Sequence, residues 1–132
     1  MREVFERPPN FDAINAKFRI AGRPVIFCWG EIIYNPQRVR LTLALRAHEA
    51  VHSRRQGDDI PGWWRRYIDD REFRLAEEIP AHCAEYLKLI EQRGNRQGRR
   101  AALKQVANRL SSPLYGGVIT AVKARRLLAE AT

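Results

Sequence analysis

The chain has 132 residues, of which 24 are lysine or arginine and 15 are aspartate or glutamate, so its formal net charge is +9 at pH 7. This length predicts one compact domain, and a hydrophobic content of 45% is enough to build a core, which argues against a disordered chain. No apolar run approaches the roughly 18 residues that cross a bilayer, and the first residues lack the apolar stretch of a secretory signal. We therefore expect a cytoplasmic protein with no membrane partner, and leave association with a virion open.

The elements predicted in chain order alternate between short helices and one β-rich stretch. They are a helix over 12–18, one bent strand or a tight pair of strands over 25–34, a helix over 40–56, a helical segment over 63–92 and helices over 99–110 and 116–129. Pro80 has no N–H to give to Ala76, so we expect it to kink or restart the helical segment. The pattern predicts an α+β fold that is mostly helical, with a small β-sheet or hairpin before the second helix.

The second of these helices carries the chain's clearest chemical motif, H-E-x-x-H, formed by His48, Glu49 and His52. Histidines four residues apart lie on the same face of a helix, so both can bind one metal ion. Imidazole and carboxylate are ligands that zinc accepts, and a catalytic zinc site has three such ligands and a water. Glu49, about 100° further around the helix, is expected to accept a proton from that water as the catalytic base.

A third ligand must come from elsewhere, and residues 74–86 offer several. Glu78 and Ala81 are spaced E-x-x-A, and the small alanine lets this helix pack closely against the motif helix. Glu77 and His82 are the alternatives to Glu78 as the third ligand.

H-E-x-x-H on one helix followed by E-x-x-A on the next resembles the gluzincin-type zinc metallopeptidases. The length and arrangement resemble their compact ImmA/IrrE-like and SprT-like groups and small phage- or prophage-encoded zincin domains. The resemblance covers roughly residues 24–90. It implies a minimal zincin-like metallopeptidase core over 1–92, with His48, His52 and Glu78 as ligands of Zn²⁺. It also implies that the protein hydrolyses peptide bonds in a protein or peptide substrate.

A zinc peptidase also needs a hydrogen-bond donor near the substrate's carbonyl oxygen, which becomes an oxyanion when water adds. Arg74, His82 and Tyr86 lie near Glu78 in the sequence and are predicted to serve there or to support the ligands. Tyr67 is a further candidate, although both tyrosines also suit the core.

The excess positive charge lies beyond the motif. Residues 41–92 hold 8 basic and 10 acidic groups, whereas residues 93–132 hold 9 basic groups and a single acid, Glu130. Apolar residues at helical spacing predict that 93–132 is a basic helical extension packed on the same domain. Arginine suits phosphates and carboxylates alike, so the alternative function is a non-catalytic module on a zincin scaffold that binds nucleic acid or an acidic protein, alone or within a larger assembly. The arginines expected to make these contacts are Arg93, Arg96, Arg99 and Arg100.

Overall fold

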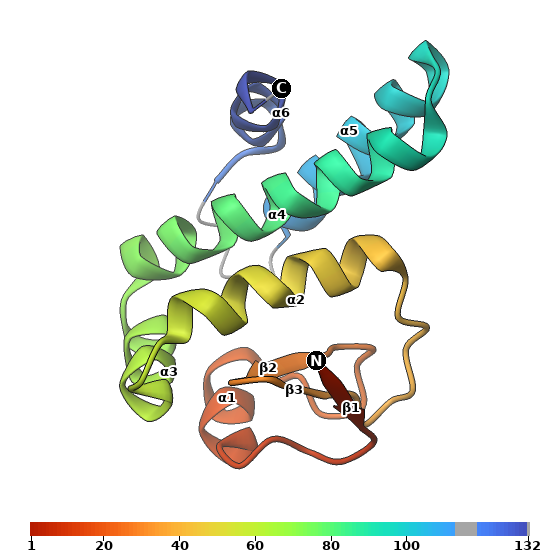
Figure 1. Cartoon of the computed structure of the whole chain (residues 1–132). Coiled ribbons are helices and arrows are strands. Elements are labelled where there is room, and N and C mark those ends of the chain that lie inside the picture. The colour runs from red at the N-terminus through yellow and green to blue at the C-terminus, as the bar shows by residue number, and fades with distance from the viewer. Residues whose placement is uncertain (113–118, 132) are drawn as a thin grey trace.

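The computed structural model describes residues 1–112 and 119–131 of the chain (Figure 1). Its elements are β1 (Arg2–Val4), α1 (Phe11–Phe18), β2 (Phe27–Trp29), β3 (Ile32–Tyr34), α2 (Leu43–Gln56), α3 (Ile60–Asp69), α4 (Arg71–Arg93), α5 (Arg96–Leu110) and α6 (Ala121–Glu130). These described residues form an α+β structure that is mostly helical with a small sheet, so the predicted fold class is confirmed. No helix among them is both long and apolar enough to cross a membrane.

The sheet has the strand order β1-β3-β2, with β1 parallel and β2 antiparallel to β3. β2 and β3 are the tight pair of strands predicted for 25–34, and their turn contains Gly30, whose φ of +59° favours glycine. The sequence does not predict β1, because three residues are too few to show a strand's alternation. The buried side chain of Asn35 ties this region together, since it donates to Glu3 Oε2 at 2.7 Å and accepts from the N–H of Val39 at 2.8 Å.

Helix α2 begins where a side chain caps it. The hydroxyl of Thr42 accepts a hydrogen bond from the backbone N–H of Leu45, so the helix starts at Leu43, later than the predicted range 40–56. It ends before Gly57, whose φ is +58°.

The helical segment predicted over 63–92 is two helices, α3 and α4, which meet at Asp70. The side chain of Asp70 accepts hydrogen bonds from the N–H groups of Glu72 and Phe73, and so caps α4. Of the two expectations for Pro80, the restart is wrong, because α4 continues through it to Arg93. Proline has no N–H, so α4 loses one backbone hydrogen bond at Pro80. Contacts with α2, α3, α5 and α6 support the helix on its other sides.

The described part of the C-terminal segment contains the two helices α5 and α6. The side chain of Asn95 accepts from the N–H of Gly98, so α5 begins at Arg96, before the predicted residue 99. α6 covers most of the helix predicted over 116–129, and residues 116–118 lie outside the described residues.

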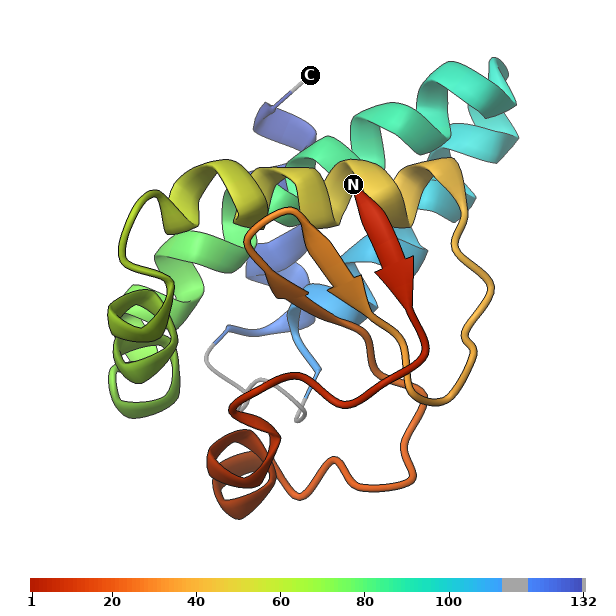
Figure 2. The ribbon, with the colours of Figure 1, turned by 60° about the horizontal axis from the view of Figure 1, so that its bottom comes forward.

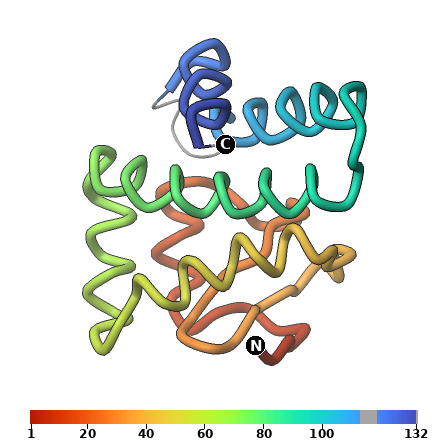
Figure 3. Tube along the Cα trace, turned by 45° about the horizontal axis from the view of Figure 1, so that its top comes forward, coloured from red at the N-terminus to blue at the C-terminus, as the bar shows by residue number. Residues whose placement is uncertain are grey.

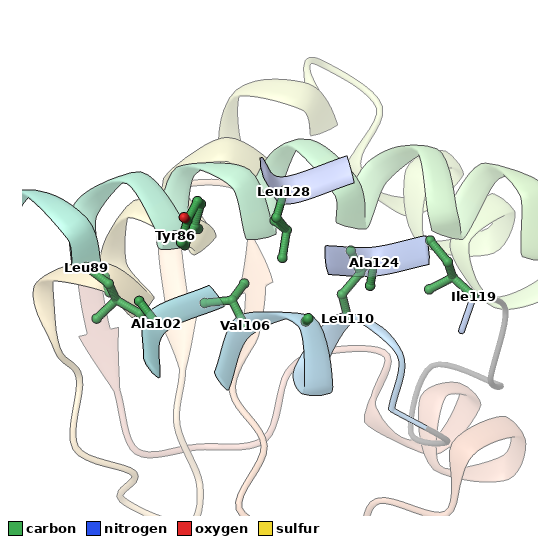
Figure 4. Close-up of a cluster of buried hydrophobic side chains, with 10 residues drawn as sticks. Tyr86, Leu89, Ala102, Val106, Leu110, Ile119, Ala124 and Leu128 are labelled. Atoms are coloured by element: carbon green, nitrogen blue, oxygen red, sulfur yellow. The ribbon is translucent and has the colours of Figure 1, made fainter. Parts of the chain in front are cut away.

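Helices α2 and α4 run side by side through the middle of the structure, with the sheet and α1 on one side and α5 and α6 on the other (Figures 1 and 3). Strand β2 lies against α2 (Figure 2). Two apolar clusters flank the helix pair. The first joins α2, α4, α5 and α6 and consists of Ala44, Tyr86, Leu89, Ala102, Val106, Ala107, Leu110, Ile119, Ala124 and Leu128 (Figure 4). The second lies near α1, β2 and α3 and consists of Phe11, Ile14, Ile20, Phe27, Trp63, Trp64 and Tyr67.

Because the first cluster joins the C-terminal helices to α4, truncating a side chain at its centre should lower the stability of the whole chain. We expect Leu110→Ala, at a side chain only 1% exposed, to lower the free energy of unfolding by about 2–5 kcal/mol in one cooperative transition, as measured by urea denaturation. Leu87→Ala, at an exposed position of α4, is the control and should change it by about 0.5 kcal/mol or less. A separate early transition in the Leu110 variant would contradict a shared core.

Candidate metal centre

The three predicted ligands converge between α2 and α4. His48 and His52 lie one turn apart on α2, and Glu78 reaches them from α4. The two Nε2 atoms are 3.1 Å apart, His48 Nε2 is 3.4 Å from Glu78 Oε2, and His52 Nε2 is 3.3 Å from Glu78 Oε1. All three side chains are buried, so the group is enclosed rather than an exposed cluster of polar residues.

These distances fit zinc. Zinc bonds to histidine nitrogen and carboxylate oxygen are about 2.0–2.2 Å long, and tetrahedral corners at that bond length are about 3.3 Å apart or slightly more. Two imidazoles and one carboxylate are also a ligand set that catalytic zinc uses. Within the described residues, Glu78 Oε2 is buried without a hydrogen-bond donor of good geometry. A cation between the three side chains would satisfy that oxygen, which is otherwise unfavourable to bury.

The neighbouring acid, Glu77, faces elsewhere. Its Oε2 accepts hydrogen bonds from Arg55 Nε and Nη2 at 2.9 and 2.7 Å, and its Oε1 accepts from Trp63 Nε1 at 2.6 Å. These bonds hold the carboxylate among residues of α2 and α3, so Glu78, not Glu77, is the acid that the structure brings to the histidines.

His82 belongs to a neighbouring group and not to the group of the three predicted ligands. Its ring is fully buried and lies edge-on against His48 with centroids 4.4 Å apart. Its Nε2 is 3.3 Å from Glu78 Oε2, and its Nδ1 is 3.5 Å from Glu85 Oε1. His82, His48 and Glu85 therefore form a second group whose ligand atoms also lie close enough together to hold a metal ion.

Glu49 lies beside the three ligands without joining them. Its Oε1 is 4.0 Å from His48 Nε2, and it lines the same cavity. Burial raises the pKa of Glu49, with a further upward contribution from Glu78, while the two histidines oppose the change. A carboxylate with a raised pKa accepts a proton more readily, which is what a general base near a metal-bound water requires.

Two residues of this centre are absent from the sequence predictions. Glu85 Oε1 lies 3.0 Å from His48 Nδ1 and 2.7 Å from Arg109 Nη1, so it connects a ligand on α2 to the helix α5. Glu85 lies seven residues after Glu78 on the same face of α4, a spacing that could have indicated it. No local pattern marks Arg109, because only the packing of α5 brings it to this place.

Of the other predicted supporting residues, Tyr86 and Arg74 contact the surrounding structure, and Tyr67 contacts Glu78. Tyr86 belongs to the first apolar cluster. Arg74 is buried and donates to the backbone carbonyls of Tyr67 and Ile68, each at 2.9 Å, so it fastens α4 to the end of α3. Tyr67 does face the centre, where its hydroxyl donates to Glu78 Oε1 at 2.7 Å.

A cavity of about 60 Å³ opens onto the ligands, and its other walls are mainly apolar side chains of α1, α3 and residues 20–28. A wider groove of about 500 Å³ meets it, with Val25, Ile26 and Glu49 common to both, and extends to Arg109. Glu49 therefore lines both the small cavity and the larger groove.

The charged groups of the centre strongly perturb one another. Burial disfavours the imidazolium of His48, but the close carboxylates of Glu78 and Glu85 and the charge of Glu49 outweigh it and raise the pKa of His48 to about 10. For Glu78, burial acts upward, yet the three histidines hold its pKa well below the usual range. In the metal-free protein His48 is therefore protonated at neutral pH, and metal binding must displace that proton.

Comparison of the chain with protein-family models, curated proteins and solved structures finds no match. The resemblance to zinc metallopeptidases therefore stays a prediction from the sequence motif.

The raised pKa of His48 predicts how zinc binding depends on pH. Below about pH 10 the binding of each zinc ion must release the proton of His48. The apparent zinc affinity should therefore rise about tenfold per pH unit between about pH 6 and about pH 8. Competition with a chromophoric chelator measures the affinity, and calorimetry in buffers of different ionisation enthalpy counts the released proton. An affinity that does not change with pH would contradict the protonated state of His48.

Proposed function

We propose that the protein is a zinc-dependent metallopeptidase that hydrolyses peptide bonds in a protein or peptide substrate. The observation that supports this best is the convergence of His48, His52 and Glu78, whose ligand atoms lie within 4.8 Å of one another, with Glu49 beside them in the same cavity. A metal held only for structure usually has four protein ligands. Three ligands and an adjoining cavity instead support a catalytic site with one open position.

Each residue then has a defined part in the reaction. Bound zinc supplies a Lewis acid, which lowers the pKa of a water and polarises the substrate's carbonyl. Glu49 accepts the proton of the attacking water and returns it to the leaving amine, and its raised pKa suits both transfers. The hydroxyl of Tyr67 holds Glu78 through Oε1, and so orients that ligand from the cavity wall.

The surroundings suit a peptide that crosses the site. The apolar wall of the cavity excludes water from around Glu49, which strengthens the electrostatic interactions of the centre. The open groove on the other side of Glu49 gives room for the rest of the chain. Peptide binding along Val25 and Ile26, which line both spaces, would bring a scissile bond to Glu49.

The proposal predicts that metal binding and catalysis separate in one variant. Glu49→Gln should bind about one zinc per chain with nearly unchanged affinity and should lower the cleavage rate of a denatured protein substrate by about 10²–10⁴-fold. Metal analysis and a time course of proteolysis measure the two effects. Glu31→Gln, at an exposed position, is the matched control and should keep both properties. Wild-type protein that binds no zinc, or a Glu49→Gln variant that cleaves at the wild-type rate, would contradict the proposal.

The second candidate function is polyanion binding through α5, and the exposure of its arginines favours it. Arg96, Arg99 and Arg100 are exposed on the first turns of α5, and Arg93, just before it, is half-buried and donates to Gln105. Such a surface would bind nucleic acid through phosphates, without sequence preference, either in place of catalysis or beside it.

This second candidate predicts a salt-dependent interaction with DNA. Changing Arg96, Arg99 and Arg100 together to glutamine should weaken binding to a duplex and reduce the slope of log affinity against log salt by about 3, if each arginine neutralises one phosphate. The control changes three exposed arginines outside α5, which are Arg54, Arg65 and Arg71. Equal losses in the two triple variants would show that only net charge matters.

A further inference from the structure

Glu85 is a buried carboxylate that lies between a proposed zinc ligand and a residue of α5. Its side chain is 1% exposed, with Oε1 3.0 Å from His48 Nδ1 and 2.7 Å from Arg109 Nη1. Glu85 lies on α4, His48 on α2 and Arg109 on α5, so the contacts of Glu85 connect three helices.

This arrangement determines which nitrogen of His48 faces the metal. An ionised carboxylate attracts a nitrogen that carries a proton, so the position of Glu85 Oε1 3.0 Å from Nδ1 favours the form in which Nδ1 is protonated. The other nitrogen, Nε2, points at His52 and Glu78 and is the one that must bind the ion. A metal-bound histidine often donates its second ring nitrogen to a carboxylate, which fixes the orientation of the ring.

Arg109 completes the arrangement because Glu85 shares its surroundings with two other buried acids, Glu49 and Glu78. A buried carboxylate requires a cation and hydrogen bonds to offset the loss of water. Arg109 supplies the cation, with Nη1 2.7 Å from Glu85 Oε1. It precedes Leu110, which is buried in the first apolar cluster, so the packing of α5 on α4 holds it in place (Figure 4).

We infer that Arg109 and Glu85 are positioning residues of the metal centre, so that α5 is part of the zinc site and not an accessory to it. This inference rests on the proposed zinc site, but not on peptide hydrolysis. It places an essential part of the centre outside residues 1–92.

Zinc affinity in a matched set of variants tests the inference. Arg109→Met should weaken zinc binding by about 10-fold or more, and Arg109→Lys should recover part of the loss. Lys104→Met, which removes an exposed cation of the same helix, should bind zinc like the wild type. The absorption spectrum of the cobalt-substituted protein should change in Arg109→Met and stay the same in Lys104→Met, since it reports the geometry at the ion.

A double-variant cycle shows whether Arg109 acts through Glu85. Glu85→Gln should weaken zinc binding by about 10–100-fold, and adding Arg109→Met to it should cause little further loss. The double variant leaves no unpaired buried charge, so it remains informative if Arg109→Met alone does not fold. Additive losses in the cycle would show that Arg109 does not act through Glu85.

The outcomes separate this inference from the proposed function. Zinc binding without cleavage contradicts the peptidase alone. Equal zinc affinity and equal cobalt spectra in wild type and Arg109→Met overturn the positioning role alone. A wild-type protein that binds no zinc contradicts both.

Discussion

The structure depends on the burial of ionisable side chains between two helices. His48, Glu49 and His52 on α2 face Glu78, His82 and Glu85 on α4, and all six are buried. Groups of this kind stay in a protein interior only when each finds partners of opposite charge or hydrogen bonds. The helix pair therefore gains little stability from these six residues, and apolar packing must offset the cost of burying them.

The two apolar clusters provide that stability from opposite sides. The first fixes α5 and α6 on α4, and with them Arg109, which neutralises the innermost acid, Glu85. The second, rich in aromatic residues, places Tyr67 against Glu78 and forms the wall of the cavity. The polar centre and its apolar surroundings are thus interdependent: each cluster supports one layer of hydrogen bonds around the histidines.

The parts of this arrangement that the sequence predicts are those that local periodicity encodes. Helical spacing places His48 and His52 on one face, and β-branched residues around Gly30 mark the pair of strands. Helical periodicity alone does not distinguish Glu77 from Glu78, which only the E-x-x-A resemblance favours, because neighbouring residues on a helix point about 100° apart and the packing decides which faces α2. Arg55 and Trp63 take Glu77, which leaves Glu78 for the centre. The position of Arg109 beside Glu85 cannot be predicted from the sequence for the same reason, since this contact arises only when α5 packs against α4.

The contact between the end of α2 and strand β2 affects how other chains can approach. β2 is an outer strand, and outer strands present unpaired backbone groups to which further strands can add. The side chain of Gln56 donates a hydrogen bond to the carbonyl of Cys28 and accepts one from the N–H of Gly30. Trp64 Nε1 also donates to the carbonyl of Cys28. Strand addition is therefore blocked at the hairpin end of β2. A segment that joins this edge is directed to the residues before Cys28, and these residues line the cavity that contains Glu49.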